Sequence, residues 1–253
     1  MQAVVITGAS AGIGKEFARQ LAAEGKSLVL VARRLDRLEA LAAELRDGHG
    51  IEVACIASDL AQPQASAELV KALEEQQIAV TGLINNAGFG DRGQFADLDL
   101  QRQLDMVQVN VTALVDLTWR LLPALKQAQD AFVINVASTA AFQAGPNMTI
   151  YYATKAFVLS FSEGLHEELK GSGVAVSALC PGATDSEFAT EAHMTDTLLF
   201  KAGTMRTDAV VKKSLAARRR AIVIPGLKNL LLVWMGKLSP RMITRRLAGM
   251  LQA

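Results

Sequence analysis

The chain has 253 residues, of which 51% are hydrophobic, so one domain with a sizeable buried core is expected. No apolar run reaches the roughly 18–20 residues of a membrane-spanning helix, and no basic-then-apolar leader precedes residue 2, which favours a cytoplasmic protein. The formal net charge is only +1, and Cys55 and Cys180 have no second Cys or His at metal-ligand spacing, which argues against a metal site or a disulfide framework.

Seven short apolar runs alternate along the chain with segments of helical periodicity. The runs lie near residues 2–7, 27–32, 51–57, 80–85, 131–137, 173–180 and 221–225. The helical segments lie near residues 12–25, 34–47, 63–77, 97–127, 150–171 and 207–219. This alternation predicts a single α/β domain over residues 1–253, with a doubly wound, seven-stranded parallel sheet of the Rossmann type and helices on both faces. Residues 183–206 interrupt the alternation as a mixed insert, and residues 226–253 extend past the last strand.

A glycine-rich turn joins the first apolar run to the first helical segment. Residues 7–14 read Thr-Gly-Ala-Ser-Ala-Gly-Ile-Gly. Gly8 allows the turn, Gly12 lets the backbone approach a pyrophosphate, and Gly14 lets helix and strand pack closely. Free N–H groups at the helix start would then face the phosphates. The turn therefore predicts a dinucleotide site, although a tight turn of this kind can also bind nothing.

A serine, a tyrosine and a lysine form the second informative pattern. Tyr151 and Lys155 lie four residues apart in a helical segment, and Ser138 lies thirteen residues before Tyr151, after an apolar run. Positions i and i+4 share one face of a helix, so the phenol and the ammonium can converge. A nearby cation lowers the pKa of a phenol from its usual value of about 10. Together with the serine hydroxyl, these groups can move a proton on or off an alcohol or a carbonyl.

The two patterns together resemble the short-chain dehydrogenase/reductase family. The resemblance runs from Thr7 to about Thr184 and includes further positions in the same order, namely Asp59, Asn85-Asn86-Ala87-Gly88, Asn110 and Pro181-Gly182. It implies a fold that binds a nicotinamide dinucleotide and hydride transfer between C4 of the nicotinamide and a substrate carbon. The likeness is greatest to the general carbonyl and 3-oxoacyl reductase branch that carries a C-terminal extension.

The resemblance also implies a role for each position. Tyr151 is the acid/base, and Lys155 additionally holds the nicotinamide ribose. Ser138 binds the substrate oxygen, and Asn110 kinks its helix and holds a water that joins Lys155 to solvent. Asp59 binds the adenine amino group, unless it only caps a turn. The further implied cofactor contacts are Gly8, Ser10, Gly12, Ile13, Gly14, Leu60, Asn86, Ala87, Gly88, Pro181, Gly182 and Thr184.

The end of the second apolar run predicts which dinucleotide is bound. An NAD site would place Asp or Glu here to bind the ribose 2′-hydroxyl, whereas this chain has Arg33 and Arg34. A guanidinium suits the 2′-phosphate of NADP, to which Ser10 can add a hydroxyl. We therefore expect NADP(H) rather than NAD(H). The alternative is that both arginines are solvated residues at a helix start.

The predicted function is the NADP(H)-dependent interconversion of a lipophilic ketone or aldehyde and an alcohol. An apolar substrate pocket is suggested by Phe89, Phe142, Met148, Phe188, Met194 and Phe200. One alternative is a reductase of 3-oxoacyl thioesters, whose acidic carrier docks on the basic C-terminus. The other is a cofactor-binding regulator or scaffold without turnover, which the presence of Ser138, Tyr151 and Lys155 disfavours.

The C-terminal tail is strongly basic. Ten basic residues and no acidic one follow Asp208, whereas residues 1–208 contain 16 basic and 25 acidic residues. The pattern in residues 226–253 predicts two helices with apolar faces, separated at Ser239-Pro240. This tail either folds onto the substrate pocket or a subunit interface, or makes a peripheral contact with an anionic membrane. Nucleic acid is not an expected partner, because the tail has no recognised binding motif and the main body is acidic.

A homodimer or homotetramer is expected. The helical segments 97–127 and 150–171 resemble those that pair between subunits in the family. The first segment carries an apolar stripe made of Leu114, Leu117, Leu121 and Leu125. A monomer would leave such a stripe partly uncovered, unless the stripe packs on the chain's own sheet.

Overall fold

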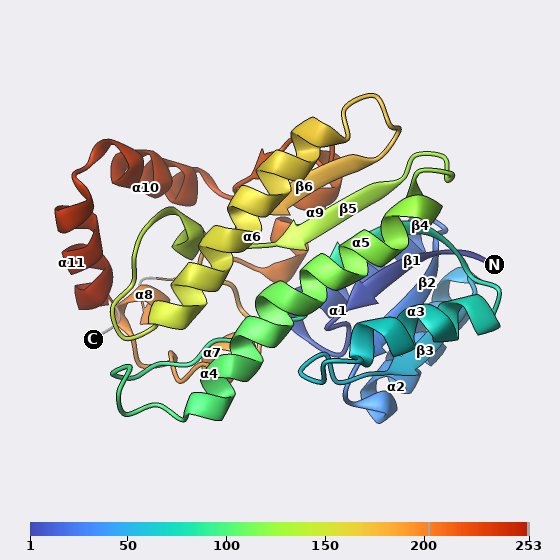
Figure 1. Cartoon of the computed structure of the whole chain (residues 1–253), viewed down its shortest axis with the longest axis horizontal. Helices are drawn as coiled ribbons and strands as arrows, with labels where there is room; N and C mark the ends of the chain where they lie inside the picture. The colour runs from blue at the N-terminus through green and yellow to red at the C-terminus, as the bar shows by residue number, and fades with distance from the viewer. Residues whose placement is uncertain (202, 252–253) are drawn as a thin grey trace.

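A parallel sheet of seven strands separates two layers of helices (Figure 1). The computed structural model describes residues 1–201 and 203–251. The strand order is β3-β2-β1-β4-β5-β6-β7, and every pairing is parallel, which confirms the predicted fold class. The strands are β1 (Gln2–Thr7), β2 (Ser27–Ala32), β3 (Val53–Ala57), β4 (Ala79–Asn85), β5 (Phe132–Val136), β6 (Ala175–Leu179) and β7 (Ile222–Val223).

The strands are apolar throughout because both faces of the sheet are covered. In β1, Val4 and Ile6 belong to the core on one face, whereas Ala3 and Val5 belong to the core on the other. The first face is covered by α1 (Gly12–Ala23), α2 (Leu35–His49) and α9 (Thr207–Ala216). The second is covered by α3 (Ala65–Glu75), α5 (Ala113–Leu125) and α6 (Thr149–Glu168).

The long helical segment predicted near 97–127 is interrupted. It consists of α4 (Leu100–Val107), a π-helical turn η1 (Gln108–Thr112) and α5. A π turn widens the helix by one residue and is frequent at functional sites. Here it carries Asn110, which is buried. The interruption agrees with the irregularity expected at that residue.

A buried chain of amides ties β4, β5 and the two covering helices together. Asn85 Nδ2 donates to Thr118 Oγ1 and to Asn135 Oδ1, each at 2.9 Å. Asn135 Nδ2 in turn donates to Ser162 Oγ at 2.9 Å. Buried polar groups with partners fix a unique arrangement of their elements. Asn86 follows β4 directly, and Ser138 follows β5 after one residue, so these hydrogen bonds also position two predicted site residues.

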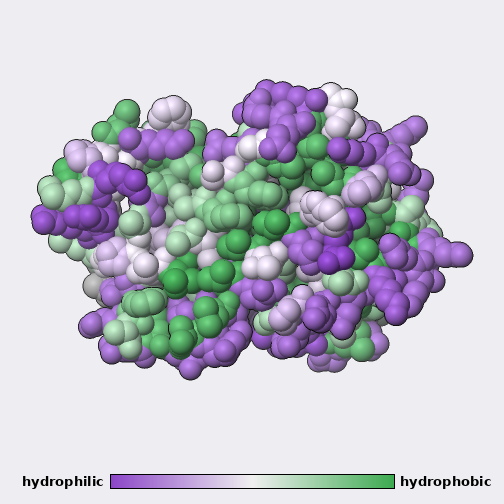
Figure 2. Space-filling model, viewed as in Figure 1, coloured by the Kyte–Doolittle hydropathy of each residue, from purple (hydrophilic) through white to green (hydrophobic). Residues whose placement is uncertain are grey.

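The leucine stripe predicted to face a second subunit is buried instead. Leu114, Leu117, Leu121 and Leu125 all pack into the cores between α5 and the sheet, so that part of the prediction was wrong. An apolar stripe of this width can pack on a sheet or on a helix of a second subunit, so sequence alone did not distinguish the two arrangements. Figure 2, which looks onto α4, α5 and α6, shows hydrophobic side chains that remain exposed along them. Leu104, Val107 and Phe157 are among these.

Two segments extend the alternating pattern. The insert after β6 contains the short helices α7 (Phe188–Glu191) and α8 (Leu198–Lys201). The chain ends in α10 (Leu227–Leu238) and α11 (Arg241–Leu251), which lie together at one end of the molecule (Figure 1). None of the helices in the described part of the chain is both long and apolar enough to cross a bilayer.

Candidate active site

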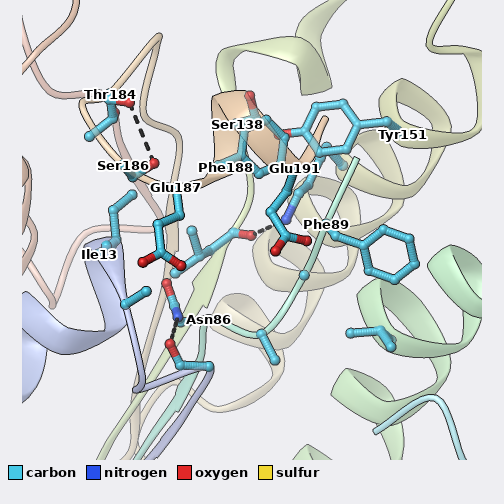
Figure 3. A pocket seen from close by; sticks show the side chains of 18 of the residues that line it. Ile13, Asn86, Phe89, Ser138, Tyr151, Thr184, Ser186, Glu187, Phe188 and Glu191 are labelled. Atoms are coloured by element: carbon cyan, nitrogen blue, oxygen red, sulfur yellow. Dashed lines mark hydrogen bonds between the residues drawn. The ribbon is translucent and has the colours of Figure 1, made fainter. Parts of the chain in front are cut away.

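A cavity of about 520 Å³ opens along the carboxyl edge of the sheet. Its walls come from the segments that follow β1 to β6 and from the insert after β6 (Figure 3). The predicted site residues that line it are Gly8, Ser10, Gly12, Ile13, Arg33, Arg34, Asp59, Leu60, Asn86, Ala87, Gly88, Ser138, Tyr151, Lys155, Pro181, Gly182 and Thr184. Within the described residues, Gly14 and Asn110 are the predicted positions that lie behind this lining.

The three glycine positions in the turn after β1 have little or no space for a side chain. Gly8 has φ +66°, and a Cβ on it would lie 2.8 Å from Asn86 Nδ2. A Cβ on Gly14 would overlap the carbonyl oxygen of Gly8. Gly12 has φ +53°, and its Cβ would lie 3.0 Å from Cβ of Ser186, in the insert. The bare backbone at the start of α1 therefore forms a cradle that fits the pyrophosphate of a dinucleotide.

Asn86 joins this turn to the end of β4. Its Nδ2 donates to the carbonyl oxygens of Thr7 at 2.9 Å and Gly8 at 3.1 Å. Thr7 Oγ1 accepts from the backbone N–H groups of Asn86 and Ala87, each at 3.0 Å. Four hydrogen bonds thus lock the turn against the neighbouring strand. The adenosine-ribose contacts predicted for Asn86 and Ala87 stay predictions.

Ser138 and Tyr151 lie next to each other at the far end of the cavity (Figure 3). Ser138 follows β5 and caps the 3₁₀ turn η2 (Thr139–Phe142), where its Oγ accepts from Ala140 N at 3.1 Å. Tyr151 is buried near the start of α6. Burial raises the pKa of Tyr151, and a hydrogen bond with Ser138 offsets only part of that rise. The phenol is therefore protonated at neutral pH.

Lys155 lies one helical turn after Tyr151 and is also buried. Its Nζ donates to Val136 O at 2.8 Å and lies 5.8 Å from the centroid of the Tyr151 ring. Burial lowers the pKa of Lys155 from 10.5 to about 8. The sequence predicted a net lowering of the pKa of Tyr151 by this ammonium. The structure has the opposite net shift, because removal of the phenol from water is the largest effect.

Asn110 connects the loop after β4 to α6. Its Nδ2 donates to Phe89 O at 3.0 Å and to Thr154 Oγ1 at 3.1 Å, and its Oδ1 accepts from Phe89 N at 3.1 Å. A Cβ on Gly88 would lie 2.9 Å from the same Oδ1 and 3.4 Å from Lys155 Nζ. The amide thus positions the backbone beside Lys155. Its predicted role in holding a water stays a prediction.

The arginines after β2 meet an acidic residue that sequence reasoning missed. Arg34 Nη2 donates to Ser10 Oγ at 3.2 Å and to Glu187 at 3.0 Å, and Arg37 donates to Glu187 at 2.8 Å. Partial burial acts to raise the pKa of Glu187, but the hydrogen bonds from both arginines outweigh it and the net shift is downward. Arg33 is exposed at the cavity mouth. Glu187 belongs to the insert, so no local pattern connects it with α2.

Asp59 adopts the simpler of its two predicted roles. Its Oδ1 accepts from Ala61 N at 3.2 Å, and its backbone oxygen accepts from Gln62 N at 2.9 Å, which closes a turn after β3. The side chain also lines the cavity. Contact with adenine stays a prediction.

The segment after β6 is covered by the C-terminal extension. Thr184 Oγ1 donates to Gly182 O at 2.9 Å. The side chain of Asn229, on α10, lies where a Cβ on Gly182 would be, and its Nδ2 donates to Pro225 O at 2.8 Å. Asn229 was missed, although it is the one amide in an otherwise apolar and basic helix and could have signalled an inward face.

The part of the cavity near Tyr151 is largely apolar. Five of the six predicted pocket residues line it, namely Phe89, Met148, Phe188, Met194 and Phe200. The sixth, Phe142, was wrongly placed there; it packs outside the lining, under Lys237, whose Nζ lies 5.0 Å from the ring centroid. Arg102 lies 5.1 Å above the Phe89 ring, and Glu191 also lines the cavity, so its mouth is charged.

Known proteins share both the sequence pattern and the fold. Residues 2–197 match the family model described as short chain dehydrogenase. Sulfoacetaldehyde reductase from Chromohalobacter salexigens is 42% identical over 187 residues, which cover 73% of each chain. Very-long-chain 3-oxoacyl-CoA reductase from Anas platyrhynchos is 34% identical over 182 residues, which cover 70% of this chain but only 58% of that protein.

Solved structures extend the likeness to nearly the whole chain. A short-chain dehydrogenase from Sphingobium yanoikuyae, in complex with NADPH, is 35% identical with a TM-score of 0.82, and the match covers 94% of this chain and 97% of that one. A relative from Burkholderia phymatum, in complex with NAD, is 26% identical with the same TM-score of 0.82, and the match covers 92% of each chain. Chains of this fold thus hold either cofactor.

The buried lysine predicts a pH-dependent difference in stability. Between pH 8 and 10.5, an unfolded chain keeps the Lys155 proton that the folded chain has lost, so the free energy of unfolding should rise with pH. Lys155→Met removes this contribution. Urea unfolding at pH 7.5, 8.5 and 9.5 should therefore show the wild type gaining stability relative to Lys155→Met as pH rises.

Lys71→Met provides the control. Lys71 is an exposed lysine on α3, paired with Glu75 one turn later. Its removal should leave the pH dependence of unfolding unchanged. A constant difference between the wild type and Lys155→Met across this range would contradict the lowered pKa.

Proposed function

The chain belongs to the short chain dehydrogenase family, and we propose that it is an NADP(H)-dependent reductase of lipophilic ketones or aldehydes, or runs the reverse oxidation. Oxidoreductase chemistry on alcohol and carbonyl groups follows from the family. One observation carries the proposal for these residues. Ser138, Tyr151 and Lys155 line one end of a cavity whose other end is the glycine cradle after β1.

The proposed proton transfer uses groups that the fold already positions. A bound nicotinamide would supply or accept the hydride. Ser138 Oγ and the Tyr151 hydroxyl would hold the substrate oxygen, and Tyr151 would donate its proton as negative charge develops there. Burial favours this direction, because it keeps Tyr151 protonated, and a forming alkoxide is more basic than a phenolate. Lys155, behind the phenol, would hold the ribose and supply positive charge.

Tyr151→Phe tests this function because it removes only the phenol oxygen. Loss of a positioned general acid should lower kcat by about 10²–10⁴-fold, with cofactor binding retained. Tyr152→Phe is the matched control, since the two rings are neighbours with centroids 6.1 Å apart. Turnover is measured with NADPH on a panel of ketones, aldehydes and acyl thioesters. Equal loss in the two folded variants would assign the acid elsewhere, and no turnover of any substrate by the wild type would favour a binding protein without catalysis.

The preference for NADP(H) is supported by the positive charge after β2. Arg33, Arg34 and Ser10 line the cavity, and Arg34 donates to Ser10 Oγ. Arg37 lies close by, where it shares Glu187 with Arg34. Guanidinium groups bind phosphate with paired N–H donors. The Sphingobium yanoikuyae relative was solved with NADPH. NAD(H) remains the alternative, as the Burkholderia phymatum relative holds NAD.

Glu187 provides the test of this preference. Its carboxylate pairs with Arg34 and Arg37, so Glu187→Gln should free the Arg34 guanidinium for the 2′-phosphate. Exposed ion pairs are worth up to about 1 kcal/mol, so the Kd for NADPH should fall by about two- to fivefold while the Kd for NADH changes little. Calorimetric titration measures both constants.

Glu44→Gln is the control for this substitution. Glu44 pairs with Arg19 on the outer side of α1 and α2 and lies outside the cavity lining of the described residues. It should change neither constant. A wild-type protein that binds NADH more tightly than NADPH would refute the cofactor assignment before any substitution is made.

The substrate class is proposed from the walls around Tyr151. Aromatic and methionine side chains surround the phenol, which favours a lipophilic carbonyl. A second candidate is a 3-oxoacyl thioester, favoured by the likeness to the very-long-chain 3-oxoacyl-CoA reductase from Anas platyrhynchos. An acidic carrier of such a thioester would bind to the basic C-terminus through opposite charge. The substrate panel also includes small polar aldehydes, because Arg102 and Glu191 make the mouth of the cavity charged. The Chromohalobacter salexigens relative is named a reductase of one such aldehyde, sulfoacetaldehyde.

We further propose that the protein is cytoplasmic. We also propose that it forms a homodimer or homotetramer through α4 and α6. Leu104 and Phe157 are exposed on these helices, and Phe157 stacks on Phe161. Exposed large apolar side chains on neighbouring helices are typical of subunit interfaces. Leu104→Glu combined with Phe157→Glu should lower the mass measured by sedimentation, whereas Leu35→Glu on α2 should not. A monomeric wild type at micromolar concentration would end this proposal.

A further inference from the structure

The helices α10 and α11 have their apolar residues on the side that faces away from the protein. In α10, Asn229, Val233 and Gly236 face the body of the protein. Asn229 lies on Gly182, Val233 is buried, and a Cβ on Gly236 would lie 3.6 Å from Gln143 Oε1. Their spacing of four and three residues places them on one stripe of the helix.

The opposite stripe of α10 consists entirely of large apolar residues. Leu227, Leu231, Trp234 and Leu238 follow each other at intervals of four, three and four residues, so they share one face. Leu227 is 72% exposed, Trp234 is 57% exposed and Leu238 is 81% exposed. An ordinary surface helix has the reverse arrangement, with polar residues outward. The outward face of α10 is therefore built to contact something else.

The next helix repeats the arrangement. In α11, Ala248 is buried in the cavity wall, and a Cβ on Gly249 would lie 3.4 Å from Pro146. The exposed large residues of α11 are Met242, Ile243, Leu247 and Met250. Green and purple atoms lie side by side at the end of the molecule that carries the two helices (Figure 2, left). We refer to the exposed residues of α10 and α11 as the C-terminal surface.

The charged residues of the C-terminal surface are all basic. They are Lys228, Lys237, Arg241, Arg245 and Arg246. No Asp or Glu follows Asp208, whereas residues 1–208 have an excess of acidic residues. The ammonium of Lys237 lies near two aromatic rings, with its Nζ 5.0 Å from the Phe142 centroid and 5.9 Å from the Trp234 centroid.

We propose that the C-terminal surface docks on the anionic surface of a lipid bilayer. Apolar side chains on a helix can enter the boundary between headgroups and acyl chains, and a tryptophan suits that boundary because its ring is amphipathic. Lysines and arginines at the rim then meet anionic headgroups. A bilayer satisfies both the apolar face and the one-sided charge.

A second copy of the same surface fits less well. Symmetric pairing would bring five basic residues from each chain together without a single acidic residue between them. An acidic protein would satisfy the charge but not the extended apolar face.

The docking itself does not depend on the proposed function. Its consequence does rest on that function, namely that a lipophilic substrate would reach the cavity from the bilayer past Ala248.

Vesicle flotation with the full-length protein tests the docking without cofactor or turnover. The vesicles contain phosphatidylcholine alone or phosphatidylcholine with 30% phosphatidylserine, at low salt. The protein should float with the anionic vesicles only, and 0.5 M NaCl should weaken binding because exposed charges are then screened. Leu231→Ser combined with Leu238→Ser should raise the lipid concentration for half-binding at least about tenfold.

Two controls are matched to the substitutions. Leu35→Ser replaces an exposed leucine on α2 and should not alter binding. Arg245→Gln with Arg246→Gln should weaken binding by about fivefold per residue, whereas Lys212→Gln with Lys213→Gln makes the same charge change on α9 and should not.

Three results would overturn the proposal. The first is a protein that stays with the buffer at low salt in the presence of anionic vesicles. The second is binding that survives both the leucine and the arginine substitutions, or that the controls weaken equally. The third is a change in oligomeric mass on Leu231→Ser with Leu238→Ser without vesicle binding, since the surface would then be an interface between copies or with another protein.

Discussion

The hydrogen bonds between Asn86 and the turn after β1 are the constraint on which the site depends. β1 lies between β2 and β4 in the sheet. The connection after β1 leads toward β2, whereas the connection after β4 leads to the opposite side, toward β5. Asn86 holds Thr7 and Gly8 in place from the end of β4, and Gly14 packs against Gly8 and the Asn86 side chain. A crevice forms where the strand order reverses. It is lined by the cradle, by Arg33 and Arg34, and by the residues proposed to transfer the proton.

Burial then determines the protonation of Tyr151 and Lys155, the groups proposed to act in the reaction. Removal from water disfavours the charged form of both Tyr151 and Lys155, raising one pKa and lowering the other to about 8. At neutral pH the phenol therefore keeps its proton, while the lysine is still mostly charged. The pair provides a proton donor backed by positive charge, which is the arrangement that a carbonyl acceptor requires. A solvated tyrosine would be equally protonated but would have no reason to remain beside Ser138.

Local sequence patterns correctly predicted the features that depend on neighbouring residues, such as the bounds of single strands. β1 and β2 begin and end at the predicted residues, and β4 begins one residue before its predicted run. The other predicted runs reach slightly past their strands because apolar side chains continue into the loops. Contacts between distant segments were not predictable. Glu187 meets Arg34 and Arg37 only because the insert folds back over α2, and Asn229 meets Gly182 only because α10 returns to β6. The prediction that the leucine stripe of α5 faces a second subunit was wrong for a related reason. Periodicity identifies an apolar face but not the layer that covers it.

The C-terminal extension joins the cavity to the outside of the molecule. The inward stripe of α10 holds Gly182 through Asn229, and α11 contributes Ala248 to the cavity wall. The outward stripes of the same helices carry the exposed leucines and Trp234. An α-helix with its side chains is only about 10–12 Å wide, so whatever covers the outer face lies within one helix diameter of the substrate end of the cavity. Because both stripes belong to the same rigid turns, a contact that orders the outer face also orders the inner one. The extension is therefore part of the active-site wall as well as of the surface.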